Sequence, residues 1–292
     1  MSIRWPWNRK SIFSRSIPPL RAAALSDVGK VRENNEDAYV ALPERGLFIV
    51  SDGMGGHLGG EVASEIVVEV LPLILEERMS AAELSDFGDV ASLVHDAIVD
   101  LSNQVQRQSA DQPGLSGMGA TVVVACALGD RAIIANLGDS RVYRYREPDL
   151  EQLTEDHSIV GILLRGGDIE TNEVKDHPAR GRLSRFLGME GEVLPDVIIV
   201  EFVPGDRLLL CSDGLSGEVD DGSMSVILDQ ESSCETACQR LIDAALAAGG
   251  GDNITVLVAD RLEELEHPTI QPSVSSTSES TENSTESPNK ER

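Results

Sequence analysis

Four aspartates adjoin apolar, strand-like runs, and their placement could bring four carboxylates together. They are Asp52 after residues 46–51, Asp139 after residues 131–137, Asp213 after residues 207–211 and Asp252 before residues 254–259. A single Asp beside a Gly at a strand end usually forms a turn, but the ends of strands in a packed sheet converge. Carboxylates that meet repel one another, and divalent cations with oxygen ligands relieve that repulsion. The spacing therefore predicts a site for Mg²⁺ or Mn²⁺.

A second charged group lies near the amino terminus, in residues 27–39. Glu36 and Asp37 are adjacent acids, and Arg32 precedes Glu36 by four residues. One interpretation is an exposed charged turn. The other is a further pair of metal ligands beside a guanidinium that grips a phosphate group by two hydrogen bonds.

The elements that must position these residues are short buried strands and amphipathic helices. Runs rich in Val, Ile and Leu predict strands over residues 46–51, 121–128, 131–137, 197–202, 207–211 and 254–259, with another beginning near Arg141. Apolar residues at three- and four-residue spacing predict helices over residues 62–71, 90–105 and 238–246, with Pro72 bending or ending the first. Tight turns between strands favour mainly antiparallel sheets, and helices between the strand groups favour layers of helix on sheet.

Composition argues against several classes of function. The 292 residues hold 24 Lys and Arg against 50 Asp and Glu, a net charge of -26. Bare nucleic acid requires the opposite charge on its partner, so we expect no nucleic-acid binding. The sequence shows no apolar run of about 18 residues that could cross a membrane. Its four cysteines form no pair of Cys-x-x-Cys units, which argues against a zinc site. Nothing in their spacing suggests a disulfide framework, which fits a reducing compartment, and we expect a cytoplasmic location.

Charge also divides the chain into three parts. Residues 1–21 carry five basic residues and no acid, and they contain Trp5, Trp7 and Phe13 among prolines. We expect a disordered extension there, with an organelle transit peptide or a short anchor at an acidic membrane surface as the less favoured alternatives. Residues 22–266 carry a net charge of -29 and form the expected folded domain. Residues 267–292 are rich in Ser, Thr and Glu, which predicts a disordered tail.

Seven short motifs follow one another along residues 22–262. They are GKVRENNED (29–37), SDGMGGHLGGE (51–61), GMGAT (117–121), LGDSRVY (137–143), LTEDHS (153–158), CSDGL (211–215) and GGDNIT (250–255). In these motifs the chain resembles the metal-dependent serine/threonine protein phosphatases of the PP2C (PPM) family, in their compact bacterial form. The resemblance implies an α+β fold, a four-layer α-β-β-α sandwich of two mainly antiparallel sheets flanked by helix pairs.

The resemblance also implies which residues hold two core metal ions. Asp52 matches the acid that bridges the two ions. The carbonyl of Gly53 and the side chain of Glu36 match ligands of one ion. Asp213 and Asp252 match ligands of the other ion. The implied cofactors are therefore two ions of Mn²⁺ or Mg²⁺.

Further residues match positions around that centre. Asp139, together with Asp213, matches a third and looser metal site found in bacterial members. Asp37 resembles an acid that holds water beside the ions. Arg32 matches the arginine that grips the phosphate group. Residues 156–188 match a mobile flap beside the site that influences substrate choice.

The activity implied by the resemblance is metal-dependent hydrolysis of phosphoserine and phosphothreonine in proteins. The two ions activate a water molecule that attacks phosphorus directly, while Arg32 and the ions offset charge on the phosphoryl oxygens. Two other functions stay open: a catalytically silent phosphatase-like module that regulates a partner, and a hydrolase of small phosphate esters. The expected partners are phosphorylated proteins, among them a cognate Ser/Thr kinase and its targets, and we expect a monomer.

Two features depart from relatives. Many eukaryotic members have a His directly after the Asp-Gly pair as a proposed general acid, whereas this chain has Met54. His57, three residues on, either contacts the substrate or is a surface residue. The flap reads Arg180-Gly181 where bacterial members often read Arg-Asn, which leaves substrate preference open.

Overall fold

Two β-sheets and six α-helices make up the described part of the chain. The computed structural model describes residues 17–55, 59–82 and 86–263. The strands are β1 (Leu20–Asp27), β2 (Asp37–Leu42), β3 (Leu47–Met54), β4 (Gly119–Ala120), β5 (Val122–Leu128), β6 (Arg131–Leu137), β7 (Arg141–Arg146), β8 (Asp149–Gln152), β9 (Asp196–Glu201), β10 (Arg207–Cys211) and β11 (Ile254–Arg261). The helices are α1 (Gly59–Ala81), α2 (Phe87–Asp111), α3 (Ile159–Gly166), α4 (Asp213–Ser216), α5 (Asp221–Gln230) and α6 (Cys234–Ala248).

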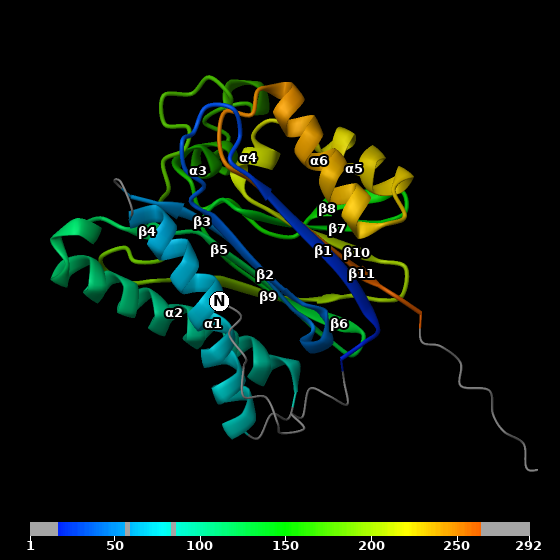
Figure 1. Cartoon of the computed structure of the whole chain (residues 1–292), viewed down its shortest axis with the longest axis horizontal. Helices are drawn as coiled ribbons and strands as arrows, with labels where there is room; N and C mark the ends of the chain where they lie inside the picture. Colours follow the sequence, from blue (N-terminus) through cyan, green and yellow to red (C-terminus); the bar gives the residue numbers. More distant parts are fainter. Residues whose placement is uncertain (1–16, 56–58, 83–85, 264–292) are drawn as a thin grey trace, which may run out of the picture.

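The two sheets stack face to face between two helical layers. One sheet has the order β1-β11-β10-β7-β8, and the other has β2-β3-β5-β6-β9, with β4 added beside β3. All strand pairs within these two sheets are antiparallel. Helices α1 and α2 cover the β2–β9 sheet, and α5 and α6 cover the β1–β8 sheet (Figure 1). The expected α-β-β-α sandwich of mainly antiparallel sheets is confirmed.

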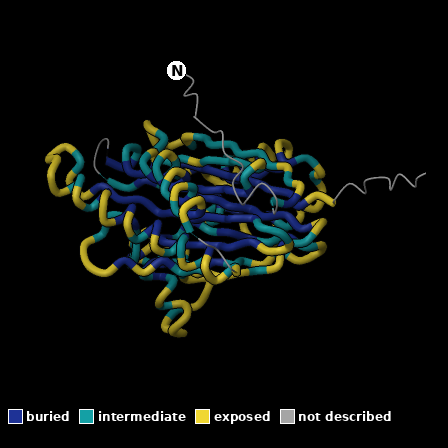
Figure 2. Tube along the Cα trace, turned by 90° about the horizontal axis from the view of Figure 1, so that it is seen from below, coloured by how far each residue is buried: buried dark blue, intermediate teal, exposed yellow. Residues whose placement is uncertain are grey.

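Burial on both faces explains why the central strands are apolar throughout. In β10, Leu208 and Leu210 pack between the two sheets, whereas Leu209 and Cys211 face the α5–α6 layer. Because successive side chains of a strand point to opposite faces, such a strand needs apolar residues at every position. Figure 2 shows the result: the strands in the middle are buried, and exposed residues lie in the outer helices and loops.

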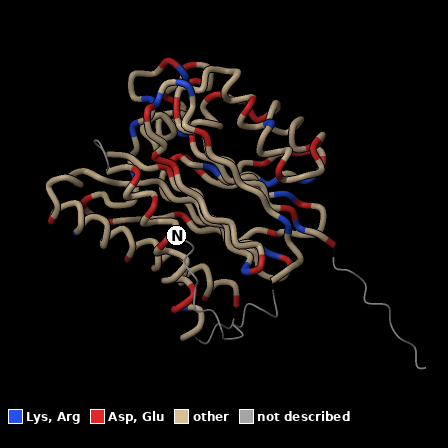
Figure 3. Tube along the Cα trace, viewed as in Figure 1, with Lys and Arg blue, Asp and Glu red and all other residues tan. Residues whose placement is uncertain are grey.

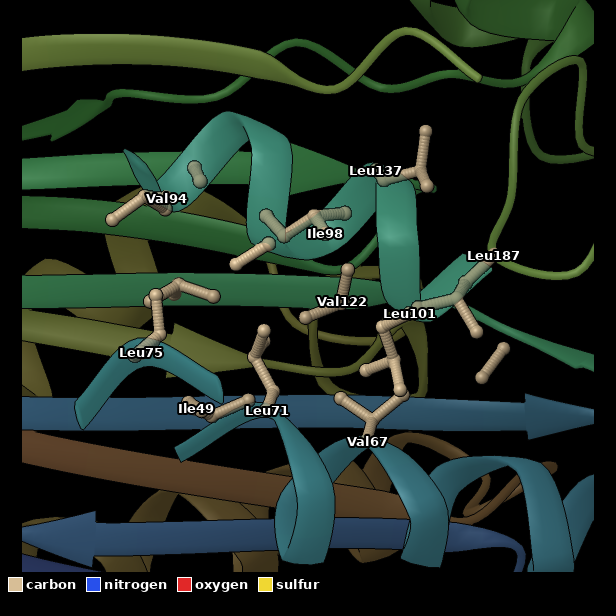
Figure 4. Close-up of a cluster of buried hydrophobic side chains, with 14 of the residues drawn as sticks. Ile49, Val67, Leu71, Leu75, Val94, Ile98, Leu101, Val122, Leu137 and Leu187 are labelled. Carbon is tan, nitrogen blue, oxygen red and sulfur yellow. The ribbon is translucent and has the colours of Figure 1, made fainter. Parts of the chain in front are cut away.

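The α1–α2 layer packs through regularly spaced side chains. Val67, Leu71 and Leu75 of α1 meet Val94, Ile98 and Leu101 of α2 over Ile49 and Val122 of the sheet (Figure 4). The spacing of three and four residues places each set on one helix face. The prediction that Pro72 could end the first helix is wrong, because α1 continues to Ala81 with Pro72 inside it. Leu71, Leu75 and Met79 are buried on both sides of Pro72, and this packing holds the helix together across the missing hydrogen bond.

Strand β1 was not among the predicted strands. It begins at Leu20, so regular structure starts before residue 22, where we expected the domain to begin. Its register with β11 pairs Leu20 with Arg261 and Asp27 with Ile254. Residues 1–16 and 264–292, which include most of the two expected tails, lie outside the described residues. Within the described residues, no helix is both long and apolar enough to span a bilayer.

Candidate active site

The predicted acidic residues gather at one end of the stacked sheets. Asp37 begins β2 and stands directly opposite Asp52 of β3. Asp213 follows β10 of the other sheet, and the neighbouring Ser212 donates a hydrogen bond of 2.7 Å to Oδ2 of Asp37. This contact joins the strand ends of the two sheets. Figure 3 shows that most charged positions lie outside the central strands, so acids at this end are exceptions that need a reason.

Burial and mutual repulsion raise the pKa values of the carboxyl groups in this cluster. Burial raises the pKa of Asp52 well above its usual value, and the charges of Asp37, Asp213 and Asp139 raise it further. Burial is likewise the largest cause that raises the pKa of Asp37 to about 7 and that of Asp139 to about 8. The pKa of Asp213 is raised by burial and by the charge of Asp252. A cluster of this kind favours protons or cations.

Glu36 lies over the first turn of α1, where two glycines make room for it. A Cβ atom added to Gly60 would stand 2.7 Å from the Glu36 carboxyl carbon. A Cβ atom added to Gly53 would stand 2.0 Å from the carbonyl oxygen of Gly60. The backbone N–H of Gly53 donates to the carbonyl of Glu36 at 3.0 Å. Burial raises the pKa of Glu36, and Arg32 opposes that rise.

Asn253 fixes the loop that carries Arg32 and Glu36. Its side-chain nitrogen donates to the carbonyls of Val28 and Asn34, each at 2.9 Å. Its side-chain oxygen accepts the backbone N–H of Glu36 at 2.8 Å. One amide therefore ties residues 28–36 to the start of β11 beside Asp252. Asn253 was not among the predicted site residues, because its three contacts join segments more than 200 residues apart in the sequence.

Arg32 reaches the same cluster from that loop. Its Nη2 donates to Oδ2 of Asp252 at 2.8 Å, and both side chains are more than one third exposed. The guanidinium thus lies beside the carboxylates with part of its surface open to solvent. A cation in this place can meet an incoming phosphate group.

Asp139 is positioned by the flap. His157, which is fully buried, accepts the N–H of Gly138 on Nδ1 and hydrogen-bonds Asp196 through Nε2 at 2.9 Å. Arg141 forms two hydrogen bonds with the carboxylate of Asp156, at 2.8 and 2.7 Å. Both contacts anchor the beginning of the flap, residues 156–188, to the turn that carries Asp139.

The flap also brings a second arginine toward the acids. Nη2 of Arg180 lies 3.8 Å from the carboxylate of Glu218. The charge of Arg180 partly opposes the rise in the pKa of Asp213. A Cβ atom added to Gly217, beside α4, would stand 3.2 Å from Nη2 of Arg180. From the sequence, Arg180 was only a variable position of the flap. Its contact with the loop after Asp213 depends on how the flap folds back, and the sequence carries no local signal for that.

Two residues after Gly53, Met54 and His57, were singled out in the sequence. Met54 ends β3 at the edge of the site, in place of the His found in many eukaryotic relatives. His57 lies outside the described residues. The side chains that the structure brings together in the described part of the site are carboxylates and arginines.

The chemistry of this donor set fits hard divalent cations. Oδ1 of Asp37 is buried without a hydrogen-bond partner, which leaves a carboxylate oxygen available. Oxygen donors with a surplus of negative charge are the ligands that Mg²⁺ and Mn²⁺ select. Among the described residues, no three acidic, His or Cys side chains already stand as a complete ligand set. The fit therefore rests on donor type and charge.

Known proteins share these features along most of the chain. A sequence model of the protein phosphatase 2C family matches residues 30–248. The chain belongs to this family. It is a metal-dependent serine/threonine protein phosphatase, as the motifs predict.

Two relatives of this phosphatase 2C chain illustrate the match. The serine/threonine phosphatase stp of Listeria welshimeri is 38% identical over 245 residues, which is 83% of this chain and 96% of the relative. The serine/threonine protein phosphatase PstP of Mycobacterium tuberculosis is 39% identical over 241 residues, 82% of this chain and 45% of the relative.

Solved phosphatase structures agree with the fold. The crystal structure of PstP from Mycobacterium tuberculosis is 39% identical, with a TM-score of 0.72, and the match covers 84% of this chain and 99% of that one. The catalytic domain of a PstP was solved in complex with two manganese ions. It is 37% identical, with a TM-score of 0.71, over 84% of this chain and 99% of that one.

Proposed function

We propose that this phosphatase hydrolyses phosphoserine and phosphothreonine in proteins at the acidic cluster with two bound ions of Mn²⁺ or Mg²⁺. Asp52 would bridge the ions, Glu36 and the carbonyl of Gly53 would complete one site, and Asp213 and Asp252 would complete the other. The observation that carries this proposal is the convergence of carboxylates whose pKa values are raised by burial and mutual repulsion. Bound divalent ions would supply an activated water and would offset phosphoryl charge.

A third ion would bind between Asp139 and Asp213. Burial and the charge of Asp213 raise the pKa of Asp139, so a cation between the two carboxylates would relieve their repulsion. Two carboxylates are assigned to this third site, which is fewer side-chain and carbonyl donors than each core site would have. We expect its affinity to be lower than that of the two core sites.

The residues of this chain bind and orient the phosphate group. Arg32 would exchange its hydrogen bond with Asp252 for two bonds to phosphoryl oxygens, since a guanidinium offers paired donors in one plane. Asp37 would orient water through Oδ1, while Oδ2 stays bonded to Ser212. Arg180 of the flap would add positive charge beside Asp213.

The partners would be phosphorylated proteins, including a cognate Ser/Thr kinase and its targets. We expect the chain to act as a monomer in the cytoplasm. The four cysteines are all buried free thiols, which suits a reducing compartment.

Phosphate release from synthetic substrates tests this function. The purified chain should release phosphate from phosphoserine and phosphothreonine peptides in Mn²⁺, and excess EDTA should abolish the release. A phosphotyrosine peptide and a phosphorylated sugar serve as comparison substrates. Faster turnover of the sugar phosphate would indicate a small-ester hydrolase, and activity that persists in EDTA would contradict the metal centre.

A further inference from the structure

An apolar groove opens between α1 and the edge strand β2, at the end of the molecule away from the acids. It has a volume of about 230 Å³ and is lined by Val40, Leu42, Glu44, Arg45, Val68, Glu69, Pro72 and Leu73. That volume exceeds the roughly 150 Å³ of an apolar cavity that holds benzene. Leu73 is a large apolar side chain that is 41% exposed, so part of the apolar surface of the groove is open to solvent. The groove can therefore receive an aromatic side chain.

The backbone of the groove also offers a hydrogen-bond acceptor. Pro72 has no N–H, so the carbonyl of Val68 lacks the donor that the next helical turn normally supplies. Both residues line the groove. An indole N–H is the kind of donor that such a carbonyl accepts.

The chain before β1 leaves the fold beside this groove. Strand β1 contacts the short 3-10 turn Pro43–Arg45, whose Glu44 and Arg45 line the groove. Pro18 is still buried, and the carbonyl of Pro19 accepts the N–H of Leu262 at 2.9 Å. Residue 17, at which the described chain begins, therefore lies toward the groove end of the molecule.

Length and composition both suit residues 1–16 as the occupant. Phe13 lies seven residues before Leu20 and can reach about 23 Å from it when the chain is extended, and Trp5 and Trp7 can reach farther. These 16 residues carry Arg4, Arg9, Lys10 and Arg15 and no acid. Their three aromatic residues match the apolar lining of the groove.

Charge on the groove is complementary to that segment. Glu44 and Glu69 line the groove as exposed acids. Arg45, the basic residue of the lining, is already paired with Glu76 at 2.9 Å and lies 3.7 Å from Glu44. An acidic rim around an apolar floor favours a segment that alternates basic and aromatic residues.

We propose that residues 1–16 fold back onto the same molecule and place their aromatic side chains in the groove between α1 and β2. This contact covers the apolar lining and the exposed Leu73. It lies far from the acids, because β1 spans roughly 23 Å between Leu20 and Asp27 at a rise of about 3.3 Å per residue. The amino-terminal segment is thus an intramolecular clasp that leaves the catalytic centre open.

Tryptophan fluorescence tests the clasp without any label. Trp5 and Trp7 are the two tryptophans of the chain, so all tryptophan emission comes from this segment. The full-length protein should emit at a shorter wavelength than the same protein in urea, and acrylamide should quench it several-fold less efficiently. Emission identical to that of the urea-unfolded chain would overturn the proposal.

A matched pair of variants locates the contact. Leu73→Lys places a charge like that of the segment in the groove and should shift the emission toward the unfolded wavelength. Val226→Lys makes the same change at a 52%-exposed position on α5 and should leave the emission unchanged. Equal emission from both variants and the wild type would overturn the assignment, provided that circular dichroism shows all three folded.

Other occupants give distinct results, and each would overturn the proposal. If the blue shift appears only when vesicles of phosphatidylglycerol are added, the segment binds membranes instead. If the shift depends on protein concentration and light scattering gives the mass of a dimer, the segment binds a second copy. A shift that is independent of concentration and of vesicles supports the clasp.

Discussion

At the scale of single residues, the site is defined by carboxylates kept close despite like charge. Asp37 and Asp52 are opposed on neighbouring strands, and Asp213 is linked to them through Ser212. Such residues lower the stability of the fold when they ionise without a partner, because burial and repulsion both disfavour the charged form. We therefore propose that their placement serves cation binding and not stability.

The unfolding free energy of the metal-stripped protein should therefore fall as pH rises from about 6.5 to 8. Aspartate in an unfolded chain has a pKa of about 3.9, whereas Asp37 has a pKa of about 7 and Asp139 of about 8. Between these values the folded chain binds more protons than the unfolded chain, so raising the pH favours unfolding. Urea titrations in EDTA measure this slope.

Other titrating groups do not reverse that sign. His157 has a lowered pKa, so it is neutral in both states at the upper end of the window. The lowered pKa of Asp260 matters only in acid, where its pairing with Arg207 is lost. Replacing Asp37 by Asn should flatten the slope, and stability that rises with pH in EDTA would contradict the strained cluster.

Arg32→Ala should raise KM and lower kcat for a phosphopeptide. Hydrogen bonds to charged groups contribute about 1.5–3 kcal/mol, so we expect a loss in kcat/KM on the order of ten- to a hundredfold. Arg32→Lys should recover only part of it, because lysine cannot form the paired contact. Arg107→Ala, an exposed change on α2, is the control; an unchanged KM for Arg32→Ala would make Arg32 a plain surface charge.

At the scale of elements, the Glu36 carboxylate packs against Gly60 in the first turn of α1. Gly60→Ala should weaken Mn²⁺ binding without unfolding the protein, because the new methyl group would displace the Glu36 carboxylate while alanine favours the helix. Gly114→Ala is the matched control, since its Cβ would meet no atom within 4 Å. Mn²⁺ titration calorimetry with thermal unfolding separates the two effects. Equal Mn²⁺ affinity in both variants would contradict the role of Glu36.

The layer between the sheets should dominate stability. Leu210 is fully buried there, so Leu210→Ala should lower the free energy of unfolding by about 2–5 kcal/mol. Leu262→Ala, at a 37%-exposed position, should cost far less. Urea unfolding of both variants measures the difference, and similar losses would contradict the two-sided burial of β10.

The predicted elements succeeded where burial dictates the pattern and failed elsewhere. Strands such as β6 and β10 were predicted with their observed limits, because they are buried on both faces. Strand β1 reads LRAAALSD, and its small residues lack the β-branched signal, so pairing with β11 determines it instead. Packing of α1 overrode the local effect of Pro72.

At the scale of the whole molecule, the site exists because two sheets end at one place. The seven motifs predicted the family and the fold, and the comparisons confirm both. The roles of the acids stay a prediction: four of them adjoin predicted strands, whereas Glu36 and Asp37 stand at the start of β2, which was not predicted. The tie made by Asn253 and the approach of Arg180 depend on long-range folding, which a linear sequence does not display. The net charge of -26 therefore comes mostly from acids that solvate the surface, and we propose that about six acids form the catalytic centre.

The rate of phosphate release by Asp52→Asn tests the central claim most directly. Asparagine keeps the shape of aspartate but cannot bridge two cations by charge. With a phosphothreonine peptide and saturating Mn²⁺, we expect the variant to lose about a hundredfold or more of the wild-type kcat, while Asp130→Asn on an exposed turn stays normal. Wild-type turnover by the Asp52→Asn protein would contradict the metal centre.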